Sequence, residues 1–207
     1  MARERRVPVS VVPRARLDAL ASGMTHQGVA AWPAAAPVYS ESDIETILAG
    51  RDEPPFVLVL DGIQDPQNLG AILRVADGAG AALVVIPEHG GVGLTPTVER
   101  VSAGAASWVP VVRVVNLRRA VARLKALGLF VFAADPQAEQ VYTDVDWRGP
   151  VALVVGNEGK GVRPVVRREC DGAVRLPMAG RLASLNAATA AAVLAFEVRR
   201  QRGWSGG

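Results

Sequence analysis

The sequence contains very little cysteine or histidine. Its 207 residues include one cysteine, Cys170, and two histidines. A single cysteine cannot form a disulfide within the chain, and so few ligands exclude a zinc site built on cysteine. We therefore predict a protein of a reducing compartment that requires no bound metal.

A long hydrophobic run is also missing. The longest nearly apolar helical stretch, 187–196, is about half as long as the ~20 residues of a membrane-spanning helix. The basic residues 1–6 are followed by valines that Pro8 and Pro13 interrupt, so the apolar core of a secretory signal peptide is absent. These absences predict a cytoplasmic protein with no membrane partner.

Charge is nearly balanced over the chain but unevenly distributed. The 23 basic and 20 acidic residues give a net charge of +3, and 21 of the basic residues are arginines. The arginine guanidinium binds a phosphate through two parallel hydrogen bonds. Residues 1–16 hold five arginines and one glutamate, whereas 17–49 hold four acidic residues and neither lysine nor arginine. A polyanion would therefore meet local basic patches.

The hydrophobic pattern changes at residue 56. Residues 1–55 show no sustained helical or strand period, which predicts a basic arm and an irregular segment. Residues 56–207 contain short apolar runs typical of strands buried on both faces: 56–61, 82–87, 108–112, 129–135, 151–156 and 173–177. Stretches with helical spacing occur at 68–80, 97–104, 117–127, 164–170 and 184–202. This alternation predicts an α/β domain with a mostly parallel sheet and helices on both faces.

The first segment with candidate functional residues is 60–80. A predicted strand ends at Asp61, Asn68 opens the following helix, and Arg74 projects from its second turn. Ligands of α/β proteins gather at the carboxyl ends of strands, where this helix begins. In the alternative interpretation Asp65 or Asn68 is only a helix cap, Gly70 allows close packing, and Arg74 is solvated.

The second segment is 153–164. Gly156, Gly159 and Gly161 follow a predicted buried strand, and glycines let the backbone expose amide donors to a nucleotide-like ligand. The segment is not a Walker A loop, because it lacks four residues between its glycines and a hydroxyl residue after the lysine. An ordinary tight turn is the alternative.

The third segment is 175–202. A loop, 178–184, joins the last predicted strand to a helix that Ser184 is well placed to cap, with Asn186 in the first turn. An apolar loop with free backbone groups could close on a flat ligand such as adenine. The alternative is an ordinary core helix with a polar first turn.

Together the three segments resemble the SpoU (TrmH) family of RNA ribose 2′-O-methyltransferases, within the SPOUT superfamily. The matching positions are Asn68, Gly70 and Arg74, then Gly156, Glu158, Gly159 and Gly161, then Leu176, Pro177, Met178, Gly180, Ser184, Leu185 and Asn186. Residues 24–31 and the sequence CDG at Cys170 look most like the bacterial enzymes that methylate a guanosine ribose in 23S rRNA.

The resemblance implies an S-adenosylmethionine cofactor, a homodimer and a trefoil knot near the C-terminus. It implies cofactor contacts at Gly156, Leu176, Met178 and Leu185, and a catalytic set of Asn68, Arg74, Glu158, Ser184 and Asn186. Family members commonly have a serine where this chain has Ala188, so one polar contact would be absent. Many relatives also carry a small RNA-binding domain before the catalytic strands, for which residues 1–16 could substitute.

RNA is the expected partner, and the candidate contacts are arginines: Arg3, Arg5, Arg6, Arg14, Arg16, Arg163, Arg167 and Arg168. Three other functions stay open at this point. The chain could methylate tRNA, because relatives that act on tRNA share the same motifs. It could be an RNA-binding or ribosome-assembly protein without activity. A nucleotide hydrolase is least favoured, since the lysine-hydroxyl pair of such enzymes is missing.

Overall fold

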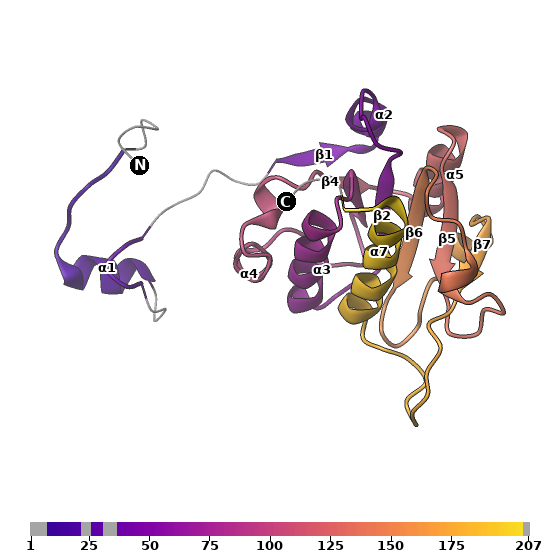
Figure 1. Ribbon diagram of the computed structural model, residues 1–207. Coiled ribbons are helices and arrows are strands. Elements are labelled where there is room, and N and C mark those ends of the chain that lie inside the picture. Colours follow the sequence, from indigo (N-terminus) through magenta and orange to yellow (C-terminus); the bar gives the residue numbers. More distant parts are fainter. Residues whose placement is uncertain (1–7, 22–25, 31–36, 205–207) are drawn as a thin grey trace. The chain divides into compact units, whose positions relative to one another are not determined.

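A computed structural model describes residues 8–21, 26–30 and 37–204 (Figure 1). Contacts divide the chain into two units, 1–35 and 36–207. In the first unit, helix α1 (Arg14–Ala21) exposes Arg14 and Arg16. The predicted RNA contacts Arg3, Arg5 and Arg6 lie outside the described residues. The predicted boundary between 55 and 56 stays a prediction.

The second unit is built on a seven-stranded sheet with the order β1-β4-β3-β2-β6-β5-β7, in which every pairing is parallel. The strands are β1 (Val38–Ser40), β2 (Phe56–Asp61), β3 (Leu83–Pro87), β4 (Val111–Val114), β5 (Phe130–Ala134), β6 (Val151–Gly156) and β7 (Gly172–Val174). The predicted α/β class with a parallel sheet is confirmed. Strand β1 was not predicted, because three residues are too few to show a period.

Helices cover both faces of the sheet, as predicted (Figure 1). They are α2 (Ile44–Leu48), α3 (Pro66–Gly78), α4 (Pro96–Val101), α5 (Leu117–Ala126), α6 (Pro164–Arg167) and α7 (Ala187–Arg202), with 3-10 turns η1 (Glu41–Asp43), η2 (Ala105–Ser107) and η3 (Tyr142–Asp144). In β2, Phe56, Leu58 and Leu60 pack with α3 and α7, whereas Val57 and Val59 pack with α5. Burial on both faces explains why the strand sequence is continuously apolar.

Arg202 fixes the end of α7 to the loops before two central strands. Its guanidinium donates hydrogen bonds to the carbonyl oxygens of Trp147 at 3.0 Å, Pro54 at 2.6 Å and Gly149 at 2.6 Å. Partial burial lowers the pKa of Arg202. A cation in the last turn also interacts favourably with the helix dipole. The side chain therefore joins α7 to the amino-terminal ends of β2 and β6.

The strand order brings the first two candidate segments together. β2 and β6 are neighbours at the centre of the sheet, and Asp61 pairs in register with Gly156 where both strands end. The chain after β2 enters α3, and the chain after β6 enters the glycine-rich loop 156–161. Both segments therefore begin at one edge of the sheet, where α/β proteins bind ligands.

No helix in the described part of the chain is long and apolar enough to cross a bilayer. The trefoil knot that the resemblance implies stays a prediction.

Candidate cofactor-binding and active site

A pocket of about 490 Å³ opens beyond the carboxyl ends of β5 and β6. Its walls come from the loop after β5, from the glycine-rich loop after β6, and from the segment between β7 and α7. This volume lies within the ~300–1,000 Å³ that is typical of small-molecule sites. Three chain segments that are far apart in sequence therefore converge on one cavity of cofactor size.

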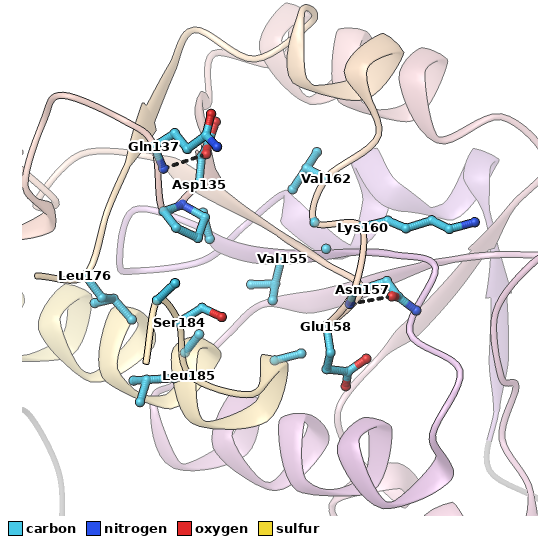
Figure 2. A pocket seen from close by; sticks show the side chains of 18 of the residues that line it. Asp135, Gln137, Val155, Asn157, Glu158, Lys160, Val162, Leu176, Ser184 and Leu185 are labelled. Atoms are coloured by element: carbon cyan, nitrogen blue, oxygen red, sulfur yellow. Dashed lines mark hydrogen bonds between the residues drawn. The ribbon is translucent and has the colours of Figure 1, made fainter. Parts of the chain in front are cut away.

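Six of the predicted site residues line this pocket: Gly156, Glu158, Leu176, Met178, Ser184 and Leu185. Figure 2 shows Leu176, Ser184 and Leu185 facing Val155 across the cavity. Glu158 also lines the cavity and is exposed. The pocket thus combines an apolar wall, glycine-loop backbone and a carboxylate. That combination suits a ligand with a flat apolar part and a cationic part.

Gly156 is required by a close crossing of the chain. A Cβ at this position would lie 2.1 Å from the carbonyl carbon of Gly161 and 2.3 Å from the amide nitrogen of Val162. The loop is closed by a bridge between Asn157 and Gly161, and Gly161 has a φ of +64°. The Asn157 side chain accepts a hydrogen bond from the Gly159 amide at 2.9 Å. The loop is therefore a specific structure whose shape depends on two of its glycines.

Asn68 connects α3 to the glycine-rich loop. Its side-chain amide donates a hydrogen bond to the Glu158 carboxylate. The cap of α3 is Asp65, whose carboxylate accepts from the Gln67 amide at 2.8 Å, so Asn68 is free of a capping role. Of the two alternative caps, Asp65 is therefore the one that the structure confirms. The hydrogen bond between Asn68 and Glu158 brings together two residues of the predicted catalytic set.

An ion pair between a buried carboxylate and a half-exposed guanidinium ties the chain after the loop to β2. The Asp61 side chain is fully buried and accepts hydrogen bonds from the Arg163 amide and from Arg163 Nε, both at 2.7 Å. Asn157 adds a hydrogen bond from its side-chain amide to the Gly62 carbonyl at 3.2 Å. Arg163, a predicted RNA contact, therefore also holds the glycine-rich loop against the end of β2.

Three residues of the predicted catalytic set do not line the pocket: Asn68, which bonds Glu158 from α3, Arg74 and Asn186. Arg74 is exposed on α3 and is not a lining residue. Asn186 is the N-cap of α7, and its side chain accepts from the Thr189 amide at 2.7 Å. The prediction that Ser184 caps this helix is therefore wrong. Ser184 is instead exposed at the pocket wall.

One wall of the pocket was not predicted from the sequence: Asp135, Pro136 and Gln137 form it after β5. Asp135 accepts from the Gln137 amide at 2.9 Å and lies 3.7 Å from the guanidinium of Arg167, another lining residue. The polar sequence at the end of a predicted strand was the available signal. It could not be used, because the sequence does not reveal that β5 lies beside β6.

Comparison with known proteins assigns the chain to a family. Residues 55–196 match the SpoU rRNA Methylase family, and residues 1–36 match the family described as RNA 2′-O ribose methyltransferase substrate binding. The 23S rRNA (guanosine-2′-O-)-methyltransferase RlmB of Pseudomonas putida is 45% identical over 202 residues, covering 98% of this chain and 81% of that protein. The chain belongs to the SpoU rRNA methylase family.

Solved structures agree with this assignment. The AdoMet-bound rRNA methyltransferase from Sinorhizobium meliloti matches with a TM-score of 0.67 and 32% identity over 72% of this chain. This chain spans 57% of that structure, which is less than two thirds. The A. aeolicus TrmH/SpoU tRNA modifying enzyme matches with a TM-score of 0.67 and 27% identity over 78% of this chain and 82% of that one.

Proposed function

We propose that this protein transfers a methyl group from S-adenosylmethionine to the ribose 2′-hydroxyl of a guanosine in 23S rRNA. The observation that carries the proposal is the convergence of Gly156, Leu176 and Leu185 on one pocket beside Glu158. The activity printed for the P. putida relative supports the substrate. Activity on ribosomal RNA supports a place in the cytoplasm.

The pocket residues fit an adenosine-containing sulfonium compound. Val155, Leu176 and Leu185 would contact the flat adenine, and the backbone of the glycine-rich loop would bind its polar edge. Met178 lines the same pocket and would add a polarizable contact. The cofactor, when bound, supplies an electrophilic methyl group. The Glu158 carboxylate would favour its positive charge.

The catalytic groups must stabilise the charge that develops on the ribose oxygen as its proton passes to an acceptor, for which a phosphate of the RNA is available. Arg74 would stabilise this oxyanion, a contribution that commonly amounts to ~3–4 kcal/mol for a single donor. Arg74 is a poor general base, because a guanidinium presents five N–H donors and no acceptor for a proton. Ser184 would orient the hydroxyl. Asn68 would hold Glu158, and Asn186 would fix the start of α7.

The decisive test is transfer of labelled methyl from S-adenosylmethionine to 23S rRNA, followed by mapping of the labelled nucleotide. Arg74→Ala should retain folding and cofactor affinity and lose about 10²–10³-fold in kcat. Near-normal turnover of this variant would remove Arg74 from the mechanism. Absence of any label on RNA with the unmodified protein would favour an RNA-binding protein without activity.

A homodimer is part of the proposal, because Arg74 lies outside the pocket of its own chain. Phe196 and Trp204 expose 39% and 68% of their surfaces and their rings lie 6.2 Å apart, which supports association beside α7. In a dimer, the partner's α3 could bring its arginine to this pocket. At a cofactor concentration too low to saturate Gly156→Ala, a mixture of Arg74→Ala and Gly156→Ala should then be more active than the mean of the two variants measured separately. A mixture no more active than that mean would refute a shared site.

A tRNA substrate is the second candidate, and the likeness to the A. aeolicus tRNA modifying enzyme supports it. Parallel reactions with tRNA and 23S rRNA separate the two candidates.

The match of residues 1–36 to a substrate-binding family supports RNA capture by the N-terminal segment. Deleting 1–16 should weaken RNA binding and flatten its salt dependence. An unchanged salt slope would show that these arginines do not contact phosphates.

A further inference from the structure

A second hollow of about 260 Å³ lies beside the cofactor pocket. It is formed by the end of β2, by the turn after β3, and by the chain from Asn157 to Arg163. Asn157, Lys160 and Gly161 line both cavities, so the glycine-rich loop is the wall between them. A ligand that lies across this loop would reach both sides.

The lining of the second hollow includes two cations, Lys160 and Arg163, and one carboxylate, Asp61. Asp61 is fully buried and its charge is balanced by Arg163 through the bonds described above. Only Nε of that guanidinium bonds Asp61, and the Arg163 side chain is 54% exposed, so its other nitrogens can reach a second acceptor. Lys160 and His89 are exposed and have no hydrogen-bond or ion-pair partner among the described residues. The hollow is therefore suited to an anion.

Lys160 lines both cavities. Figure 2 shows its side chain extending away from Leu176 and Leu185, the apolar part of the cofactor pocket. The rim also contains Gly62 and Gly90, whose φ angles are +78° and +80° and which carry no side chain to cover the backbone. The opening thus presents a free ammonium beside an uncovered backbone.

The size of the second hollow limits its occupant. A volume of about 260 Å³ is below the ~300–1,000 Å³ of sites that enclose a whole small molecule. A fragment of a larger ligand fits this description better. An RNA strand with one ribose at the cofactor pocket has a phosphate on each side of that ribose.

We propose that the second hollow binds a backbone phosphate of the RNA next to the methylated nucleotide, through Lys160, His89 and Arg163. This inference rests on the proposed function. It makes Lys160 a substrate contact that sets which ribose reaches the cofactor. Phosphate contacts fix the register of a nucleic acid without reading its sequence.

The test compares Lys160→Gln and His89→Ala with the unmodified full chain and with Arg148→Gln. Arg148 is a matched control, because its exposed guanidinium lies before β6, at the opposite end of that strand from the hollow. Three quantities are measured for each: the KM for 23S rRNA, the slope of RNA affinity against salt, and the Kd for S-adenosylmethionine. Methyl transfer by the unmodified protein tests the proposed function separately.

Each hollow variant should raise the KM for RNA about 3–10-fold, and Lys160→Gln should also reduce the salt slope by about 0.7–0.9, as expected for one lost contact between a cation and a phosphate. The Kd for S-adenosylmethionine and all values of the control should not change. If the unmodified protein methylates RNA but the variants keep its KM and salt slope, the inference is wrong. A weaker cofactor affinity in Lys160→Gln would also overturn it, because Lys160 would then serve the first pocket.

Inorganic phosphate, titrated by calorimetry, distinguishes a free anion from RNA. Weak phosphate binding that both hollow variants reduce, together with their raised KM for RNA, supports the inference. Phosphate binding that the variants abolish without any change in RNA kinetics would assign the hollow to a free anion and refute the RNA contact.

Discussion

Adding one methyl group at Gly156 tests whether the close chain crossing builds the cofactor pocket. In Gly156→Ala the new Cβ would lie 2.1 Å from the Gly161 carbonyl carbon and 2.2 Å from its oxygen, whereas real Cβ contacts are essentially never below 3.0 Å. The obstructing atoms are backbone, so the two chain segments must move apart by roughly 1 Å. Overpacking of this kind costs about 1–3 kcal/mol. If this whole free-energy cost opposes cofactor binding, the cofactor Kd rises about 5–150-fold.

The assay is calorimetric titration with S-adenosylmethionine, combined with thermal unfolding of the unbound protein. Strain that the unbound protein already bears lowers its Tm, and strain that appears only on binding raises the Kd. Gly149→Ala is the matched control, because it lies before the opposite end of β6, where a Cβ meets no atom within 4 Å. We expect no change in either quantity for the control.

A Gly156→Ala protein with normal cofactor affinity and a normal Tm would refute this reasoning. The loop would then adopt another path in solution, without the contact between 156 and 161–162. A lowered Tm with normal affinity would mean that the crossing stabilises the fold and that the pocket tolerates the shift.

Three further predictions concern single side chains. Burial raises the pKa of Cys170 to about 11 from 9.0, so at pH 8 a thiol reagent should label native protein at least about 100-fold more slowly than urea-unfolded protein; equal rates would contradict this. Arg202→Ala should lower the free energy of unfolding by about 2–4 kcal/mol, since several carbonyls lose a charged donor; an unchanged urea midpoint would show that water replaces it. Asn186→Ala should cost about 0.5–2 kcal/mol in the same measurement and Asn186→Asp much less, because aspartate caps equally well. Loss of methylation in Asn186→Asp at normal stability would mean that the amide acts on the substrate.

The strands of the sheet could be predicted because short, continuously apolar runs are typical of strands buried on both faces. The runs 56–61 and 151–156 are continuously apolar and became β2 and β6 with the same bounds. The helix that ends at Arg202 was predicted to begin at Ser184, and in the structure it begins at Ala187. Serine and asparagine are nearly equivalent caps, so local sequence could not choose between Ser184 and Asn186. Burial of Ala187 and Ala188 against the core, a tertiary effect, accompanies the later start.

The pocket was predicted only where family motifs marked it. Gly156, Leu176 and Leu185 carry such motifs and line the cavity, whereas the wall at Asp135 carries none and was missed. Asp135 lines the pocket because β5 pairs with β6 in the sheet. Strand order is set by packing of the whole domain, and a local sequence pattern does not contain it.

Arg74 lies outside the pocket of its own chain. The resemblance assigns it to catalysis, yet it is exposed on α3 and absent from the lining of the pocket, while Asn68 on the same helix bonds Glu158. Residues six apart on a helix point in directions about 120° apart, so Asn68 and Arg74 lie on different faces of α3. If both act in methyl transfer, they must serve different surfaces, and a second copy or the bound RNA must bring those surfaces together. The mixing experiment with Arg74→Ala therefore tests the assembly of the site as well as the role of the arginine.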